Sequence, residues 1–514
     1  MLLVSPNKMA AYGVDVTFAI RNARFYASAD GVRIRVCSLD KDNELLEQLV
    51  ETETIHGRSD LSFAEKMNVN FRFEKIQRFR AIVLVVNSST KSVMGTMGSA
   101  DFDLSMAFAC GGRLSLPISS ASLDIFVKVP DYYSQFVRLR FFGNYLHSPD
   151  GLPLQTYFIV SIPAEDRTIM VHKSEMIRET KNPEWSAFSV PLFLLNYFNE
   201  SSVQIFVYNY TPNHEDHLIG HATTTLTQLQ QGVGHFNSYM LKEASGKRIH
   251  EKTCVELKEL TLENGPTFFQ MMANNVKLQL TAAIDLTASN GNPVSPSSLH
   301  YIHPHQPSAY LESLLQTTPP LLAYLPNPHN PYIGALGFGA KVQSPTGGLQ
   351  LSHCFCLSGA ASDPRVEGLA GLISAYRTAT MGLQPFAPTD FSEVIYFVSK
   401  FAKAESRRHV GLYFVLLILS DGGPANALNM KRTVDALVDA SPHPMSVVAV
   451  GVGGQDRDHS PMRNLEKLTL KHSDGRLLVR QNYTFVEASD LESSDVLAMI
   501  PVQMAQWQRH FHTT

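Results

Sequence analysis

The sequence is poor in the features that mark secreted and membrane-spanning proteins. Only five of its 514 residues are cysteines, an odd number scattered along the chain, which argues against a disulfide framework. No apolar stretch approaches the ~20 residues of a transmembrane helix, and the longest run, VGLYFVLLIL at 410–419, has the length of a strand. The opening segment MLLVSPNKMAAYG is too short and too interrupted for a signal peptide. We therefore expect a cytoplasmic protein.

A strong net charge is missing as well. Lysine and arginine total 43 against 47 aspartates and glutamates, which gives a formal net charge of −4. Nucleic-acid-binding proteins generally carry a basic excess or a basic face, so we expect no nucleic-acid partner. Apolar residues make up 44% of the chain, which is enough to build a core in each of about three domains of roughly 100–200 residues.

Short apolar runs fill residues 1–250, and turn residues separate them. Examples are GVRIRVC, FRAIVLVV, TYFIVSI and VQIFVYNY. Such spacing is typical of all-β sandwiches. A weak internal repeat, visible in VLVVNSST and IFVYNYTP, indicates two copies of one sandwich, which we place at residues 12–125 and 135–250.

The pattern changes in the second half of the chain. Continuous apolar runs such as GLYFVLLILSD and MSVVAVGVG alternate there with amphipathic helical segments such as FSEVIYFVSKFAKAES. This alternation predicts a parallel sheet covered by helices on both faces, an α/β doubly wound domain at residues 275–510. Residues 242–274, which start with the charged segment KEASGKRIHEK, lead from one domain to the next, and 251–274 are expected to form a linker.

Polar residues follow two apolar runs where the predicted strands end. AAIDLTASNGNP supplies Asp285, Thr287 and Ser289, and LLILSDGG supplies Asp421. Thr389, in PFAPTDF, precedes a predicted helix. Ligands of doubly wound sheets bind at the carboxyl ends of the strands, and hard oxygen donors of this kind suit Mg²⁺ better than Ca²⁺. The alternative is that the hydroxyls cap helices and the acids are ordinary loop residues.

These residues resemble the metal-ion-dependent adhesion site of von Willebrand factor A (vWA) domains. IDLTASNGNP, SLHY, ALGFGAK and MSVVAVGVG, in this order, resemble the A domain of copines. SEMIRETKNPEWSAFSVPL at 174–192 resembles the C2-domain segment in which Asn-Pro-x-Trp closes a strand turn. The sequence is thus identified as a divergent copine. The resemblance implies two all-β C2 sandwiches followed by a vWA, Rossmann-like A domain.

The resemblance also implies a function. Copines are Ca²⁺-regulated phospholipid-binding adaptors whose A domain docks target proteins. The expected partners are an anionic phospholipid surface at the plasma membrane and a protein that offers an acidic side chain to the A-domain metal. The implied cofactor is Mg²⁺ or Mn²⁺, and the matching ligand positions carry no substitution: Asp285, Thr287, Ser289, Thr389 and Asp421.

The loops that would bind Ca²⁺ depart from the C2 pattern. Ca²⁺ takes 6–8 oxygen ligands, and its affinity follows the number of charged ones. Most of the matching positions are neutral here, so we expect Ca²⁺ binding to be weakened or lost in both sandwiches. The eroded positions are Asp30, Asn87 and Ser89 in the first sandwich, and Asp150, Gln155, Asn209, Thr211, Asn213 and His217 in the second.

Membrane binding without Ca²⁺ has its own candidates. Lys173, Arg178 and Lys181 lie in VHKSEMIRETK, on the segment that would form the lipid-facing side of a C2 domain. Each basic residue near an anionic surface contributes about 1 kcal/mol. The alternative is an ordinary solvated face.

Two other functions remain open on the sequence. The first is a soluble protein-interaction scaffold that binds no lipid. The second is a metal-dependent hydrolase at Asp285, although no nucleophile elbow, phosphate-binding loop or acid–base pair is recognisable and we expect no enzymatic activity. His300, His303 and His305, in HYIHPHQP, lack converging ligands in the sequence and are expected to have a structural role.

Overall fold

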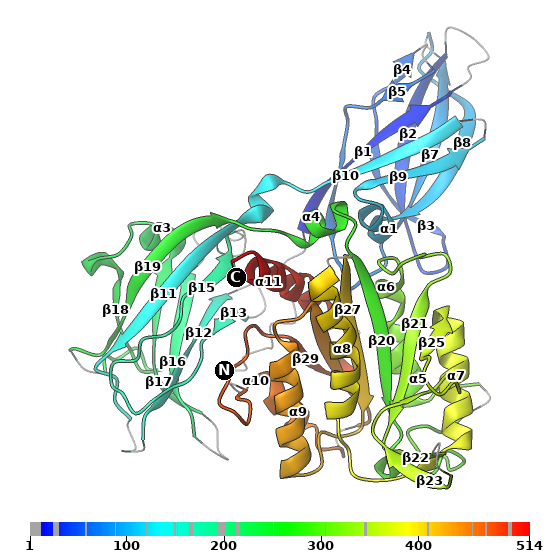
Figure 1. The fold of residues 1–514 in the computed structure, drawn as a ribbon. Coiled ribbons are helices and arrows are strands. Elements are labelled where there is room, and N and C mark those ends of the chain that lie inside the picture. Colours follow the sequence, from blue (N-terminus) through cyan, green and yellow to red (C-terminus); the bar gives the residue numbers. More distant parts are fainter. Residues whose placement is uncertain are drawn as a thin grey trace. The chain divides into compact units, whose positions relative to one another are not determined.

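A computed structural model shows the chain as two structural units (Figure 1). Residues 131–266 belong to one unit, and residues 11–130 together with 267–514 belong to the other. The structure describes residues 12–23, 30–56, 59–87, 89–119, 121–148, 151, 153–163, 168–192, 195, 202–211, 216–249, 251–303, 305–343, 347–408, 411–454, 456–467, 470–491 and 496–513.

The first sandwich consists of two antiparallel sheets. Its central strand β7 (Arg78–Asn87) alternates between buried and partly exposed residues, so one face of the strand packs on the core. The first sheet contains β5 (Leu61–Ser62), β6 (Met67–Phe71), β1 (Tyr12–Arg21), β10 (Ala121–Lys128) and β9 (Arg113–Ile118). The second contains β4 (Ile55–His56), β3 (Leu45–Glu51), β2 (Asp30–Leu39), β7 and β8 (Val93–Asp103), and α1 (Leu104–Ala109) follows it.

The second sandwich is also antiparallel, and Trp185 and Phe158 lie in its core. One sheet contains β15 (Phe188–Pro191), β11 (Gln135–Asn144), β19 (Cys254–Asn264) and β18 (Ser238–Met240). The other contains β13 (Thr168–Lys173), β14 (Ile177–Arg178), β12 (Gln155–Pro163), β16 (Ser202–Asn209) and β17 (His217–Thr225), after which comes α3 (Leu226–Leu229).

The linker predicted at 251–274 is wrong for most of its length. β19 pairs with β11 from Cys254 to Asn264, so these residues are a strand of the second sandwich. The segment CVELKELTLEN resembles a linker in the sequence because one face of the strand carries charged side chains. On the other face, Val255 and Leu257 are fully buried. The next element, α4 (Phe268–Ala273), belongs to the larger unit and packs there against α1.

Residues 277–513 form the predicted α/β fold. The strands β21 (Tyr332–Phe338), β20 (Lys277–Asp285), β27 (Leu412–Ser420), β28 (Met445–Gly451) and β29 (Tyr483–Glu487) are parallel neighbours in this order. β24 (Phe355–Cys356) and β25 (Arg365–Glu367) add to β21 in the antiparallel sense. A separate small sheet contains β23 (Leu349–Ser352), β22 (Ala340–Gln343) and β26 (Gln384–Pro385).

Helices cover both faces of the parallel sheet, which explains why its strands are apolar on both sides. On one face lie α8 (Ser392–Arg408), α9 (Ala427–Ala440) and α10 (Ser460–Lys467), whose apolar side chains share a core with Ile418 of β27 (Figure 1). The other core contains Leu417 and side chains of α5 (Ala309–Thr317), α6 (Pro319–Leu322), α7 (Gly368–Gly382) and α11 (Met499–Thr513). A membrane-crossing helix, judged by length and hydropathy, is not found in the part of the chain that the structure describes.

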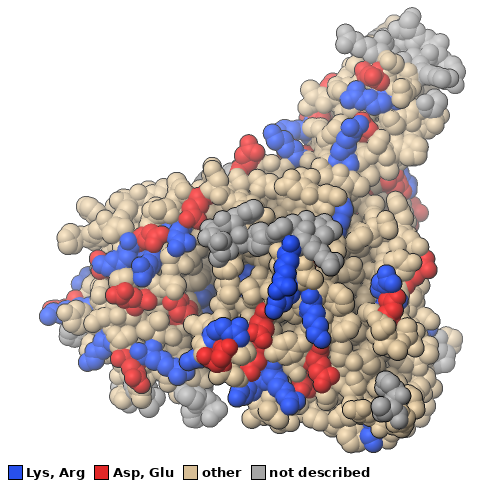
Figure 2. All heavy atoms as spheres, in the orientation of Figure 1, with Lys and Arg blue, Asp and Glu red and all other residues tan. Residues whose placement is uncertain are grey.

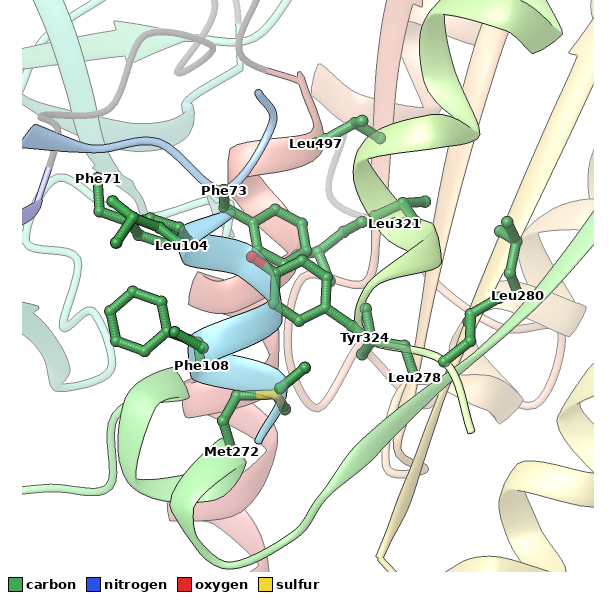
Figure 3. Close-up of a cluster of buried hydrophobic side chains, with 14 of the residues drawn as sticks. Phe71, Phe73, Leu104, Phe108, Met272, Leu278, Leu280, Leu321, Tyr324 and Leu497 are labelled. Atoms are coloured by element: carbon green, nitrogen blue, oxygen red, sulfur yellow. The ribbon is translucent and has the colours of Figure 1, made fainter. Parts of the chain in front are cut away.

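The first sandwich and the α/β domain share one continuous apolar core. Phe73, which follows β6 of the first sandwich, stacks on Tyr324 with ring centroids 4.8 Å apart (Figure 3). Phe108 of α1 contacts Phe269 of α4 at 4.7 Å, and Lys277 of β20 donates a hydrogen bond to the carbonyl of Ala109. Aromatic side chains bury large apolar areas, so these contacts bind the sandwich firmly to the domain.

Charged side chains over α8 and α9 are of mixed sign. Figure 2 shows Lys and Arg interspersed with Asp and Glu on the face in view. Arg476, for example, lies 2.8 Å from both Asp439 and Asp474. Charges that are compensated at such short range produce little field beyond a Debye length of about 10 Å. This face, as far as it is described, does not carry the basic stripe typical of nucleic-acid binding.

Candidate functional site

Two neighbouring parallel strands bring the acids of the candidate metal site together. β20 ends at Asp285, and β27 ends at Ser420, directly before Asp421. The two strands are in register up to the pair Ile284 and Leu419. Their carboxyl ends therefore lie side by side at one edge of the sheet, where doubly wound folds bind ligands.

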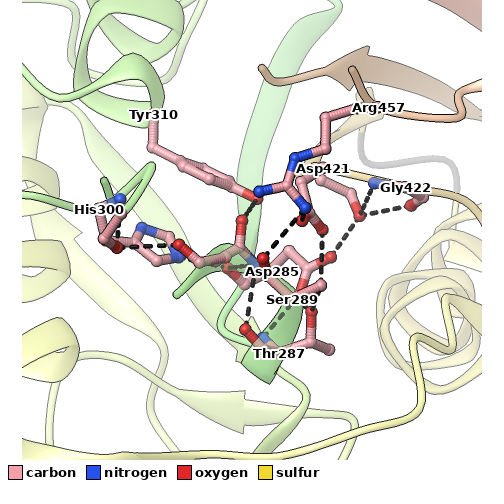
Figure 4. A network of polar contacts seen from close by, with 11 residues as sticks. Asp285, Thr287, Ser289, His300, Tyr310, Asp421, Gly422 and Arg457 are labelled. Atoms are coloured by element: carbon pink, nitrogen blue, oxygen red, sulfur yellow. Dashed lines mark hydrogen bonds and ion pairs between the residues drawn. The ribbon is translucent and has the colours of Figure 1, made fainter. Parts of the chain in front are cut away.

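The hydroxyls that follow Asp285 complete a ring of hydrogen bonds (Figure 4). The backbone N–H of Thr287 donates to Asp285 Oδ1 at 2.8 Å. The Thr287 and Ser289 hydroxyls are 2.9 Å apart, and the Ser289 hydroxyl donates to Asp421 Oδ1 at 3.0 Å. The Ser420 hydroxyl donates to Asp285 Oδ2. The structure thus brings Asp285, Thr287, Ser289 and Asp421 into one cluster, although Ser289 and Asp421 are 132 positions apart.

Burial makes the negative charge of this cluster costly. Asp285 is fully buried and Asp421 nearly so. Burial raises the pKa of Asp285 to about 7, and the charge of Asp421 adds to this rise. Burial also raises the pKa of Asp421, while the hydrogen bond from Ser289 and the charge of Arg457 oppose the rise. Two desolvated acids held together in this way favour a bound cation.

Thr389 lies in a loop that runs beside the candidate site. An isolated bridge pairs Phe386 with Thr287, which places the segment before α8 beside the metal loop. Thr389 is buried, and its carbonyl accepts hydrogen bonds from the Asn429 side chain at 2.9 Å and from the Ala425 N–H at 3.2 Å. These are contacts of its backbone, and its hydroxyl remains a predicted ligand.

Three side chains that the sequence did not single out as site residues support the loop after Asp285. Asn290, fully buried, donates to the Thr287 carbonyl at 3.2 Å, and Tyr310 of α5 donates to Asn290 Oδ1 at 2.7 Å. His300 lies 2.9 Å from the Asp285 carbonyl through Nε2. Burial lowers the pKa of His300 to about 4, so the ring is neutral at pH 7 and serves as a hydrogen-bonding strut. No local pattern marks Asn290 and Tyr310, since their roles depend on distant partners.

The loop that follows Asp285 can take its position only because residue 339 is a glycine. Gly339 has φ +77, in the left-handed region, and a Cβ there would collide with the Thr287 side chain. The close approach of the β21 end to Thr287 therefore requires a residue without a side chain.

A positively charged side chain, that of Arg457, lies at the edge of the cluster. Arg457, in the segment between β28 and α10, places Nη1 3.0 Å from Asp421 Oδ2 and 3.1 Å from the Ser289 carbonyl (Figure 4). Its side chain is 32% exposed. No local pattern in the sequence marks this residue, because 168 positions separate it from Ser289.

The donor set fits a small, hard dication. Carboxylate and hydroxyl oxygens are the ligands that Mg²⁺ and Mn²⁺ prefer, and the cluster contains both kinds within hydrogen-bonding distance of each other. A cluster of three or more His, Cys, Asp or Glu side chains suited to a metal was not found among the described residues. The candidate site relies on hydroxyls instead.

In the second sandwich, the position that would carry a Ca²⁺-binding acid performs a structural task. Asn209 is buried at the end of β16, and its Oδ1 accepts a hydrogen bond from the Gln155 N–H at 2.7 Å. Its Nδ2 donates to the Pro153 carbonyl at 3.4 Å and to the Ser148 hydroxyl at 3.5 Å. The amide therefore joins the end of β16 to the segment that leads into β12, with both its donor and its acceptor in use.

Asn209→Asp is consequently expected to destabilise the sandwich without creating a Ca²⁺ response. The new carboxylate would face the Pro153 carbonyl with no proton to donate, a loss of about 1–3 kcal/mol in the free energy of unfolding. Urea denaturation in EGTA and in millimolar Ca²⁺ measures both effects. An unfolding midpoint that rises with Ca²⁺ in this variant alone would show that the loop retains the other ligands of a Ca²⁺ site.

The remaining loop positions are only partly described. The Thr211 N–H donates to Asp216 Oδ1 at 3.1 Å, and Tyr157 donates to Asp216 Oδ2 at 2.6 Å, so this acid is engaged within the sandwich. His217 opens β17 opposite Asn209. Asp150 and Asn213 lie outside the described residues.

The first sandwich shows a similar use of its neutral residue. Asn87 Oδ1 accepts hydrogen bonds from the N–H groups of Ser89 at 2.9 Å and Thr90 at 3.0 Å, so the side chain caps its own turn. Asp30 lies opposite Asn87 in the register of β2 and β7.

The three basic lipid-binding candidates differ in exposure. Lys173, at the end of β13, holds its ammonium 4.5 Å from the centre of the Tyr157 ring and is half-buried. Arg178 and Lys181 are exposed on the segment that follows. The charges of Arg178 and Lys181 are therefore more accessible to solvent than that of Lys173.

Comparison with known proteins gives two family matches. The C2 domain model matches residues 144–241, within the second sandwich, and the Copine model matches residues 298–514, which include Thr389, Asp421 and Arg457. Among solved structures, BON1-C2B is 20% identical over 26% of this chain and 95% of its own, with a TM-score of 0.23. A pair of C2 domains from Extended-Synaptotagmin 2 is 11% identical over 51% of this chain and 97% of its own, with a TM-score of 0.21.

Proposed function

The chain belongs to the copine family, and on this premise we propose that it is a membrane-associated adaptor. Its α/β domain binds Mg²⁺ or Mn²⁺ and docks the acidic side chain of a protein partner. Its second sandwich, the part that matches the C2 domain, contacts anionic phospholipid with little or no dependence on Ca²⁺.

The hydrogen-bonded ring at the ends of β20 and β27 carries the docking proposal. It joins the buried acids Asp285 and Asp421 through the N–H and hydroxyl of Thr287 and the hydroxyl of Ser289. These four residues and Thr389 would hold the metal ion, which supplies an open coordination position for a carboxylate. Asn290, His300 and Tyr310 keep the loop in place, so the site is preorganised.

Titration of the full chain with Mn²⁺, followed by electron paramagnetic resonance, tests the metal site. We expect one saturable site for which Mg²⁺ competes. The absence of saturable binding would contradict the proposal, and so would a preference for Ca²⁺, since the donor set is rich in hydroxyls and poor in bidentate acids.

The membrane part of the proposal rests on the second sandwich. The Asn209 side chain is committed to hydrogen bonds with the segment before β12, which supports Ca²⁺ independence. Arg178 and Lys181 are exposed on one segment and supply positive charge without a metal. Basic side chains near an anionic surface attract it electrostatically, and salt screens this attraction.

Sedimentation with phosphatidylserine vesicles is expected to give the same bound fraction in EGTA and in millimolar Ca²⁺. The double variant Arg178→Gln/Lys181→Gln should weaken binding about 30-fold, because two basic residues contribute roughly 2 kcal/mol. Lys247→Gln/Arg248→Gln is the matched control, since it removes two exposed charges elsewhere in the same unit.

Three other results are informative. Binding that rises steeply with Ca²⁺ would contradict the predicted loss of Ca²⁺ sites. Loss of binding in the control pair alone would move the lipid surface to residues 242–252. If the wild-type chain binds no vesicles in either condition, the protein is a soluble interaction scaffold.

A further inference from the structure

Arg457 contacts the candidate metal site but is not one of its expected ligands. Its Nη1 lies 3.0 Å from Asp421 Oδ2, and the same nitrogen lies 3.1 Å from the Ser289 carbonyl. The Ser289 hydroxyl donates to Asp421 Oδ1, so one carboxylate oxygen accepts a hydrogen bond and the other faces the arginine as an ion pair. Figure 4 shows the guanidinium reaching over the acid from a separate segment.

The charges of the cluster explain why this contact matters. Asp285 and Asp421 are buried together, and within the described residues Arg457 is the one Lys or Arg side chain in ion-pair contact with either acid. A buried carboxylate without a compensating cation is strongly destabilising. Arg457 therefore provides part of the positive charge that a bound dication would otherwise provide.

The position of Arg457 also allows it to leave. Its side chain is 32% exposed, and it lies in the segment between β28 and α10 rather than within either element. Gly453, with φ +111, lies so close that a Cβ would come within 2.9 Å of Arg457 Cγ. The segment thus leaves room for the arginine stem beside the site while keeping its outer part open to solvent.

We propose that Arg457 is a built-in competitor of the metal ion, which neutralises Asp421 in the metal-free protein and must move away before a dication binds. This inference rests on the proposed metal site. A guanidinium and a dication cannot both lie against Asp421 without strong repulsion at such short range. The arginine lowers metal affinity and at the same time stabilises the metal-free domain.

The test compares Mn²⁺ affinity and thermal stability in four full-length proteins at one ionic strength. They are the wild type, Arg457→Gln, Arg457→Lys and the control Arg463→Gln. Arg463 suits the control because it lies on the adjoining helix α10, carries the same charge and pairs with Glu487 rather than with Asp421. Electron paramagnetic resonance gives the affinity, and unfolding in EDTA gives the stability.

Arg457→Gln is expected to raise the Mn²⁺ association constant about tenfold, equivalent to roughly 1.4 kcal/mol. The same variant should unfold at a lower temperature than wild type in EDTA, because Asp421 loses its cation. Arg457→Lys should have a Mn²⁺ affinity and an unfolding temperature between those of the wild type and Arg457→Gln. The lysine ammonium keeps the positive charge but lacks the planar, forked shape of the guanidinium. Arg463→Gln should bind Mn²⁺ as wild type does. Opposite effects on affinity and metal-free stability distinguish competition from a general loss of structure.

Every other outcome also tests the proposed role of Arg457. Equal Mn²⁺ affinity in wild type and Arg457→Gln, or weaker binding in the variant, would overturn the competitor role and leave the metal site standing. Equal gains in both glutamine variants would overturn it in favour of a net-charge effect. Mn²⁺ binding only after Arg457 is replaced would support it in its strongest form. No binding by any of the four would overturn the inference together with the proposed function.

Discussion

Asp285→Asn is expected to abolish Mg²⁺ binding by the α/β domain and the docking of an acidic partner with it. Asp285 is fully buried at the end of β20 and is hydrogen-bonded to Thr287 and Ser420. Loss of a residue that merely orients a metal ligand costs about 10–100-fold in affinity, so loss of this charged ligand should exceed about 100-fold.

The fold should survive this substitution. Asparagine has the shape of aspartate, its Oδ1 can accept from the Thr287 N–H, and its amide can donate to the Ser420 hydroxyl. The readout is the rise in unfolding temperature on adding Mg²⁺, which for the wild type corresponds to about 2.7 kcal/mol at a concentration of 100 Kd. The variant should show no rise.

Asp363→Asn is the matched control for this variant. Asp363 is exposed and pairs with Arg365 at 2.8 Å in the same domain, so its substitution removes one negative charge away from the site. It should respond to Mg²⁺ as wild type does. An undiminished Mg²⁺ response in Asp285→Asn would rule out Asp285 as a ligand and, with it, the proposed docking mechanism.

Trp185→Ala is expected to unfold the second sandwich or leave it close to unfolding. Trp185 is fully buried, packs edge-on against Phe158 at 4.9 Å and donates its Nε1–H to the Thr156 carbonyl at 3.3 Å. Truncating a buried tryptophan to alanine costs about 3–5 kcal/mol, while a domain has only about 5–15 kcal/mol of stability.

The damage should be confined to one unit of the chain. Calorimetry of the full-length variant should show a transition at lower temperature, with loss of vesicle binding, while the Mg²⁺-dependent transition stays in place. Trp185→Phe is the control, because it keeps an aromatic ring in the core and loses only part of the buried apolar area together with the hydrogen bond, which accounts for about 1 kcal/mol. Unfolding of the alanine variant at the wild-type temperature would show that Trp185 is not a core anchor.

Local patterns in the sequence predicted the classes of structure well. Alternating burial along β7 and continuous apolar runs such as β27 distinguish a half-solvated strand from one covered on both faces. The β-rich first half and the α/β second half followed from these two periods and are confirmed. β19 was missed because the charged residues on its exposed face obscure the alternation of apolar residues that would identify a strand in the sequence.

Some residues of the candidate site could be predicted from the sequence and others could not. Asp285, Thr287 and Ser289 are neighbours in the chain, so their spacing was visible, and Asp421 was found because acids that end buried strands are conspicuous. Arg457, Asn290 and Tyr310 are ordinary residues in the sequence. Their contacts with the site arise from strand order and from helix packing, which no local pattern records.

By itself, the sequence determined the β-rich first half, the α/β second half and which residues end the central strands. Only the tertiary structure decided what those residues touch. It committed the Asn209 amide to the segment before β12, joined the first sandwich to the α/β domain through Phe73 and Tyr324, and set Arg457 against Asp421. The physical reason is that periodicity tells which face of an element is buried, whereas packing and register choose the partner on that face.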